Sequence, residues 1–110
     1  MAILKTKIKV KSTQFAANSK AMQAKVDDLN QTLDSIAKGG GAESCERHVS
    51  RGKLLARDRI LGLLDPDTPF IELSPLAAHK VYSEYVPAAG IITGIGRVSG
   101  QDCVLVANDA

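Results

Sequence analysis

The chain has 110 residues and a mass of 11.7 kDa; 45% of its residues are hydrophobic, 24% are charged and 4% are aromatic, and none is tryptophan. This length allows one small domain, and the composition is unlike that of disordered chains. No stretch reaches the ~18 uncharged apolar residues that a membrane span requires. Two cysteines cannot build the disulfide framework of a small secreted fold. We therefore expect a cytoplasmic protein with reduced thiols.

Charge is distributed unevenly along the chain, although the formal net charge is only +2. Residues 1–26 carry six lysines and no acidic residue, whereas the remainder carries eight basic and twelve acidic residues and is net −4. A nucleic-acid binder usually concentrates positive charge and stacking aromatic side chains on its folded body. The body here is acidic and contains only Phe70, Tyr82 and Tyr85. The sequence therefore predicts no nucleic-acid partner.

The first 20 residues are expected to form a basic, flexible arm, with the domain occupying residues 21–110. Lysine alternates with single apolar residues from Lys7 to Lys11, which indicates extended chain. The arm lacks the continuous apolar region of a secretory signal and the arginines of a mitochondrial presequence. This favours the cytoplasm over the mitochondrial matrix.

An amphipathic helix is expected from Ser19 to Gly39. Asn18 or Ser19 can cap its start, and Gly39 is a natural end. Apolar residues at spacings of four and three form one stripe, which docks either on its own domain or on a neighbouring subunit. The stripe consists of Met22, Val26, Leu29, Leu33 and Ile36.

Four shorter features follow the glycine joint Gly39–Gly41. The pattern predicts a second helix from Ala42 to Gly52 and a third from about Ala56 to Leu64. The prolines within residues 65–69 end the third helix, because proline disfavours helix before it and cannot continue one. Residues 70–73 are expected to form a short strand.

The last third of the chain is predicted to be a β-hairpin, with strands at residues 91–98 and 103–107 around a loop at residues 99–102. Gly94 and Gly96 lie on one face of the first strand, so other groups can approach that face closely. Residues 103–107 are apolar on both faces, which is typical of a strand covered on both sides. Three helices and a few short strands can scarcely cover both faces. We therefore expect the chain to be the front of a longer protein.

No motif marks a catalytic or metal site. The residues Gly94-Ile95-Gly96 lack the third glycine of a dinucleotide-binding loop, and Gly52-Lys53 lacks the first glycine and the hydroxyl of a P-loop. Cys45 and His48 could share one helical turn, but a zinc site needs three or four ligands. No catalytic residue and no metal ligand is assigned.

Five basic residues lie within thirteen positions and could bind an anion. Guanidinium groups and helix N-termini bind phosphate well. The alternative is a solvated surface whose charges pair with Glu43, Glu46 and Asp58. The residues alone leave both interpretations open. The cluster consists of Arg47, Arg51, Lys53, Arg57 and Arg59.

Several stretches resemble one family in order along the chain. They are Gly39–Gly41, Arg47-His48, Arg51–Leu55, Arg57–Ile60, Leu63–Pro66, Pro69–Ser74, Gly90–Gly100 and Val106–Ala110. Over about residues 20–110 the chain is similar to the start of the carboxyltransferase (beta) subunits of biotin-dependent acyl-CoA carboxylases. The resemblance is closest to the branch that acts on 3-methylcrotonyl-CoA. Ala56, Asp67 and Ala88 depart from the usual family pattern, where a proline or a glycine is frequent.

The resemblance implies an α/β fold: the N-terminal part of a crotonase-like carboxyltransferase domain of ββα repeats, preceded by helices and truncated at Ala110. It implies transfer of a carboxyl group from carboxybiotin to 3-methylcrotonyl-CoA in leucine degradation. Biotin would be carried by a partner alpha subunit that uses ATP and bicarbonate, and the beta subunits would form a homo-oligomer.

The resemblance also bears on the site residues. The oxyanion-forming amides of the family lie further along the chain, so this segment alone is expected to be inactive. The phosphates of coenzyme A need cations, and Arg51, Lys53, Arg57 and Arg59 are the candidates to bind them.

Two other functions stay open. One is a sister enzyme that acts on geranyl-, propionyl- or acetyl-CoA. The other is a non-catalytic assembly or binding module.

Overall fold

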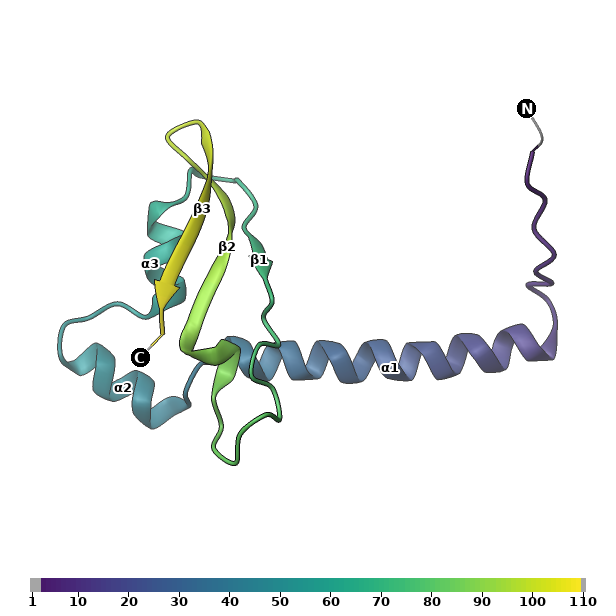
Figure 1. Cartoon of the computed structure of the whole chain (residues 1–110), viewed down its shortest axis with the longest axis horizontal. Coiled ribbons are helices and arrows are strands. Elements are labelled where there is room, and N and C mark those ends of the chain that lie inside the picture. Colours follow the sequence, from purple (N-terminus) through teal and green to yellow (C-terminus); the bar gives the residue numbers. More distant parts are fainter. Residues whose placement is uncertain (1–2, 110) are drawn as a thin grey trace. The chain divides into compact units, whose positions relative to one another are not determined.

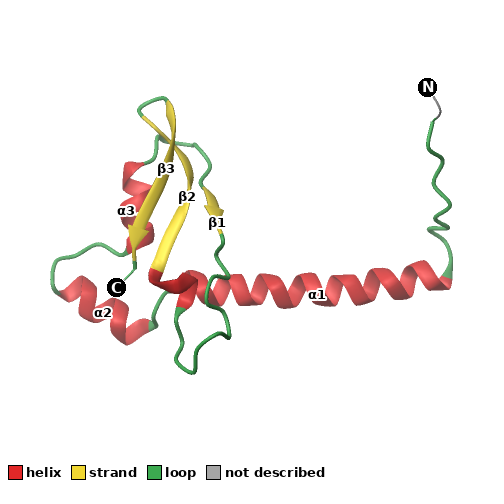
Figure 2. Cartoon of the chain, viewed as in Figure 1, coloured by secondary structure: helices red, strands yellow, loops and turns green. Residues whose placement is uncertain are grey.

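The computed structural model describes residues 3–109, and Figure 2 shows its secondary structure. The elements are α1 (Thr13–Ala37), α2 (Ala42–Ser50), α3 (Ala56–Leu63), β1 (Ile71–Leu73), a 3₁₀ helix (Pro87–Gly90), β2 (Ile91–Val98) and β3 (Gln101–Asn108). The chain divides into two compact units, one up to Thr32 and one from Leu33 onward. No helix within residues 3–109 is long and apolar enough to cross a bilayer.

Helix α1 begins at Thr13, six residues before the predicted start at Ser19. The Ser12 hydroxyl accepts a hydrogen bond from the backbone N–H of Phe15 at 3.1 Å and so caps the first turn. Residues 13–20 are therefore helical, and the prediction of a flexible arm over them is wrong. The alternating pattern ends at Lys11, and good helix formers such as Ala16 and Ala17 follow it. The arm's first two residues lie outside the described part.

The apolar stripe of α1 is covered only at its end. Ile36 is buried and Leu33 is half-buried. In contrast, Met22, Val26 and Leu29 are 62%, 40% and 43% exposed. The docking of the other three residues on the domain or on a neighbouring subunit stays a prediction.

The second unit contains a three-stranded antiparallel sheet in the order β1-β2-β3, drawn in Figure 1. Val98 pairs with Gln101, so the hairpin loop has only two residues instead of the predicted four. These are Ser99 and Gly100, with φ angles of 50° and 78°. Two consecutive positive φ values define a type I′ turn, which matches the twist of the strands.

Helix α3 packs on one face of this sheet and forms the core with it. Ala56, Ile60 and Ile92 are buried together, and half-buried side chains surround them. Gly94 and Gly96 lie on the same face of β2 as Ile92, as the sequence predicts. A Cβ on Gly94 would lie 2.2 Å from the ring of Phe70. The bare backbone therefore lets this ring reach the core.

The opposite face of the sheet is exposed. Val104 and Val106 of β3 are 71% and 62% exposed, so within the described residues this strand is covered on one face only. Ile95 pairs with Ile71 on one side and with Val104 on the other, which makes the exposed apolar residues adjacent. We call this surface the open sheet face; it consists of Ile71, Leu73, Ile91, Ile95, Val104 and Val106.

Candidate functional site

The turn between α2 and α3 positions the basic cluster. Helix α2 ends at Ser50, and Gly52 reverses the chain with a φ of 75°, which glycine adopts without strain. His48 contributes to holding the turn, because its Nε2 lies 3.1 Å from the carbonyl oxygen of Leu54. Helix α3 then begins at Ala56, with Leu55 at its N-cap and no side-chain cap.

Two open clefts lie along this turn and share His48. One has a volume of about 200 Å³ and the other about 480 Å³. No carboxylate is among the described residues that line them, so both are positively charged or neutral. The first is lined by Ser44, Arg47, His48 and Arg51, and the second by His48, Lys53, Leu54, Arg59 and Asn108. We call the two clefts together the basic groove. Its basic side chains are Arg47, His48, Arg51, Lys53 and Arg59.

Arg57 is engaged in the fold. Its guanidinium donates two hydrogen bonds to the Glu72 carboxylate, at 2.6 and 2.9 Å. The side chains are 31% and 20% exposed, so water screens the pair only partly. The hydrogen bonds to Glu72 raise the pKa of Arg57 above its usual value against the opposing effect of burial, and the charges of Glu72 and Asp109 add to the rise. This ion pair joins α3 to β1.

Two more basic residues have partners on the protein. Arg59 donates from Nη2 to the carbonyl oxygen of Asn108 at 2.6 Å and so ties α3 to the end of β3. Arg47 forms an exposed ion pair with Glu43 one helical turn away, also at 2.6 Å. Of the acids expected to neutralise the cluster, only Glu43 does so among the described residues.

Arg51 and Lys53 are exposed, and within residues 3–109 their side chains make no hydrogen bond and no ion pair. Of the four candidates for binding phosphate, the structure brings Arg51, Lys53 and Arg59 to the groove and directs Arg57 elsewhere. An anion in the groove would therefore meet two cations that no carboxylate neutralises.

The sequence reasoning missed His48 as part of this groove and considered it only as a zinc partner of Cys45. Ser44, Arg47, His48 and Arg51 follow one another at helical spacing on one face, a signal that could have identified it. In the structure the Cys45 thiol lies 3.6 Å from the carbonyl oxygen of Lys38. No group of three or more metal-ligating side chains occurs in the described part of the chain.

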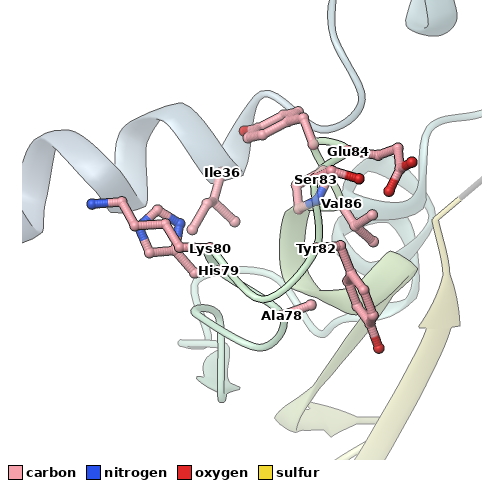
Figure 3. Close-up of a pocket in the computed structure, with 10 residues that line it drawn as sticks. Ile36, Ala78, His79, Lys80, Tyr82, Ser83, Glu84 and Val86 are labelled. Atoms are coloured by element: carbon pink, nitrogen blue, oxygen red, sulfur yellow. The ribbon is translucent and has the colours of Figure 1, made fainter.

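A third cleft, of about 230 Å³, lies between Ile36 and the loop of residues 78–87 (Figure 3). The Tyr85 hydroxyl donates to the carbonyl oxygen of Ser35 at 3.2 Å and fixes the loop to the end of α1. Figure 3 shows His79 and Lys80 extending to one side and Tyr82 and Glu84 to the other. These polar groups do not converge, so we assign no chemistry to this cleft.

Comparison with known proteins gives concordant results. The family described as "Carboxyl transferase domain" matches residues 47–110. A probable mitochondrial methylcrotonoyl-CoA carboxylase beta chain of Drosophila melanogaster is 48% identical over 98% of this chain. The biotin-dependent 3-methylcrotonyl-coenzyme A carboxylase beta1 subunit of Mycobacterium tuberculosis is 60% identical over 77% of it.

Among solved structures, the chain is similar to the beta subunit of P. aeruginosa geranyl-CoA carboxylase, with a TM-score of 0.78 and 35% identity over 96% of this chain and 20% of that one. The hexameric transcarboxylase 12S core matches with a TM-score of 0.71 and 32% identity over 80% of this chain and 18% of that one. The chain spans 19% of the Drosophila protein and 16% of the mycobacterial one.

Proposed function

The chain belongs to the carboxyl transferase domain family, and on that premise we propose that it forms part of a subunit that transfers a carboxyl group from carboxybiotin to 3-methylcrotonyl-CoA. The identities of 48% and 60% to beta subunits named for this substrate carry the proposal. A relative named for acetyl- and propionyl-CoA is only 31% identical. Geranyl-CoA is the second candidate, because the geranyl-CoA carboxylase subunit matches over 96% of the chain.

The basic groove supplies the contact to the acyl-CoA. Coenzyme A carries a 3′-phosphate and a diphosphate. Charge-assisted hydrogen bonds from cationic side chains bind phosphate more strongly than neutral hydrogen bonds do. Arg51 and Lys53 are exposed and unpaired among the described residues, and Arg59 lines the same groove. Arg57 supports the site by holding α3 to β1 through Glu72. One or two of these cations contact phosphate, and the others bind protein groups.

Biotin does not fit the described residues. Its ureido oxygen needs converging hydrogen-bond donors in a site that excludes water. The two clefts at the turn between α2 and α3 are open and lined by cationic side chains, and the polar side chains of the cleft beside Ile36 diverge. In the proposed enzyme, biotin is carried by a partner alpha subunit that uses ATP and bicarbonate. The oxyanion-forming groups also lie outside these residues, so the segment alone is inactive.

The proposal includes further beta subunits as partners and the cytoplasm as the compartment. A hexamer is named for the related transcarboxylase core. Relatives occur in mitochondria and in bacteria.

Steady-state kinetics of the full-length protein with its biotin-carrying partner tests the substrate. We expect kcat/KM to be highest for 3-methylcrotonyl-CoA among the 3-methylcrotonyl, geranyl, propionyl and acetyl thioesters. A preference for geranyl-CoA would establish the second candidate. No carboxylation of any of the four thioesters would favour an assembly module instead.

A further inference from the structure

The backbone that joins α2 to α3 is held by few contacts of its own. Backbone hydrogen bonds fix residues 51–52 to the end of α2 and residue 55 to the start of α3. Between them, Lys53 and Leu54 take part in no backbone–backbone hydrogen bond within residues 3–109. Both residues are exposed, Leu54 to 61%, so packing does not fix them either. Another contact is needed to hold this segment.

His48 supplies that contact from the last turn of α2. Its Nε2 lies 3.1 Å from the carbonyl oxygen of Leu54. A carbonyl oxygen only accepts hydrogen bonds, so the ring carries a proton on Nε2 and donates it. The ring is half-buried and lines both clefts of the basic groove. His48 therefore joins α2 to the segment before α3 at the place where the two clefts meet.

This contact determines where Lys53 lies. In the larger cleft, Arg59 is fixed by its hydrogen bond to the carbonyl oxygen of Asn108. Lys53 lines the same cleft, but its side chain has no such bond among the described residues. Its backbone directly precedes Leu54, the acceptor of the bond from His48. A loop that is held in its binding conformation before the ligand arrives loses less entropy on binding.

We propose that His48 is a positioning residue, which holds the backbone of Lys53 through Leu54 so that Lys53 and Arg59 meet the same phosphate. The inference rests on the proposed binding of acyl-CoA phosphates in the basic groove. His48 acts by raising the fraction of molecules in which the groove is ready to bind. The apparent affinity follows this fraction, whereas the chemical step does not. Loss of the donor should therefore raise KM and leave kcat unchanged.

Two amide side chains of different length test the bond in the full-length protein with its biotin-carrying partner. Glutamine places an N–H donor where Nε2 of His48 lies, whereas asparagine is too short to reach Leu54. With 3-methylcrotonyl-CoA, His48→Asn and the donor-free His48→Leu should raise KM about three- to tenfold at constant kcat. His48→Gln should keep KM near the wild-type value. The control, His79→Leu, removes the exposed second histidine and should change neither constant.

Limited trypsin digestion of the same full-length proteins measures the segment without substrate. Cleavage after Lys53 requires the segment to open, so its rate follows the open fraction. The rate should rise in His48→Asn and stay at the wild-type value in His48→Gln. A double-mutant cycle then shows whether His48 acts through Lys53. In the Lys53→Ala background, His48→Asn should raise KM no further.

Three results would overturn the proposal: unchanged cleavage in both His48→Asn and His48→Leu, unchanged KM in both, or a rise in KM that persists in full in the Lys53→Ala background. The first of these needs no substrate and is independent of what the groove binds. If KM also stays unchanged in Arg51→Ala and Lys53→Ala, the proposed phosphate contact fails as well. A rise in KM in either of those variants confines the failure to His48.

Discussion

Two glycines on β2 determine how closely neighbouring side chains and backbone can pack against this strand. At Gly94, a Cβ would lie 2.2 Å from the Phe70 ring and 2.7 Å from the carbonyl oxygen of Ile71, which belongs to the backbone of the paired strand. At Gly96, it would lie 2.2 Å from a terminal methyl group of Leu64. A backbone atom cannot move without breaking the sheet pairing, whereas a leucine methyl can rotate away. The two positions therefore tolerate a side chain to different degrees.

We expect Gly94→Ala to lower the free energy of unfolding of the full-length protein by about 3 kcal/mol and Gly96→Ala by about 1 kcal/mol, as overpacking does. Gly62→Ala is the control, because Gly62 lies in α3 and nothing lies within 4 Å of the added methyl group. It should stabilise the helix by about 0.5–1 kcal/mol. Denaturant unfolding measures all three, and equal effects at positions 94 and 96 would contradict the close approach described here.

The Arg57–Glu72 ion pair is the second residue-scale feature with a measurable contribution. Arg57→Lys keeps the charge but loses the two-pronged geometry, and we expect a cost of about 1 kcal/mol in unfolding free energy. Arg57→Ala should cost about 2 kcal/mol, because it leaves Glu72 without its partner. A double-mutant cycle with Glu72→Gln isolates the coupling, and additive effects would show that the pair contributes nothing.

The pH dependence of this arginine has a definite sign. A pKa raised by folding contributes stability that is fully present below the unfolded-state pKa and is lost as the pH rises through the folded-state value. Both values are strongly alkaline. Arg57 therefore stays charged between about pH 6 and 9. We expect the difference in unfolding free energy between wild type and Arg57→Lys to stay constant over this range.

At the scale of the elements, Asp65 connects the end of α3 to the hairpin. Its carboxylate accepts hydrogen bonds from the backbone N–H groups of Ser99 and Gly100, both at 2.7 Å. Its own N–H donates to the carbonyl oxygen of Arg97 at 2.8 Å. These three bonds hold the type I′ turn against the loop that follows α3. The hairpin is therefore anchored at its tip as well as through the core.

Asp65→Ala should cost about 2 kcal/mol in unfolding free energy, because two charge-assisted hydrogen bonds are lost at a partly exposed site. Asp65→Asn keeps one acceptor oxygen and should cost about half as much. Exchange of the amide hydrogens of Ser99 and Gly100 should accelerate in Asp65→Ala. Unchanged exchange at these two amides would show that the turn is stable without the carboxylate.

The sequence predicted elements best where local pattern decides the structure. The third helix, the hairpin strands and the packed glycine face of β2 follow from spacing and turn chemistry, and the structure has them. The start of α1 was missed because the helix was predicted from Ser19, where the apolar period changes, whereas Ser12 is the residue that caps it. The two-residue turn was missed because serine at a positive φ is a weak signal compared with asparagine.

Contacts between distant residues were harder to predict. The sequence left Arg57 either to bind phosphate or to pair with an acid of its own segment, yet its partner is Glu72 of β1. The burial of Arg57 and the bond from Arg59 to Asn108 likewise depend on the packing of α3 against the sheet. The basic cluster was recognisable from its sequence, but which of its members are free required the fold.

At the scale of the whole molecule, the predicted fold class is confirmed. The chain is α/β and matches solved carboxyltransferase beta subunits of crotonase-like fold with TM-scores up to 0.78. The open sheet face is the main apolar surface that the described residues leave uncovered. Six adjacent apolar side chains are exposed there, and a patch of this kind marks a surface that packs against other protein.

We expect the 110-residue chain, expressed alone, to aggregate or to melt over a broad, non-cooperative range, because this face and the edges of the sheet stay open. Calorimetry combined with light scattering measures both properties. A sharp two-state transition in a monomer would contradict the conclusion that the open sheet face needs cover.

The central claim is that the basic groove holds the phosphates of an acyl-CoA substrate of a carboxyltransferase. A contact at this remote end of the substrate contributes to binding and leaves the chemical step unchanged, so its loss should raise KM and leave kcat constant. Each charge-assisted hydrogen bond lost should cost about 1.5–3 kcal/mol, roughly ten- to a hundredfold in KM. Arg97→Ala, which removes an exposed arginine paired with Asp102 on the hairpin, is the matched control.

The most direct measurement is the steady-state kinetics of full-length wild type, Arg51→Ala, Lys53→Ala and Arg97→Ala with 3-methylcrotonyl-CoA and with its 3′-dephospho analogue. We predict that the wild type and Arg97→Ala prefer the phosphorylated substrate and that at least one of the other two variants loses this preference, with kcat unchanged. A preference that persists undiminished in both Arg51→Ala and Lys53→Ala would contradict the assignment and leave the groove as a solvated surface.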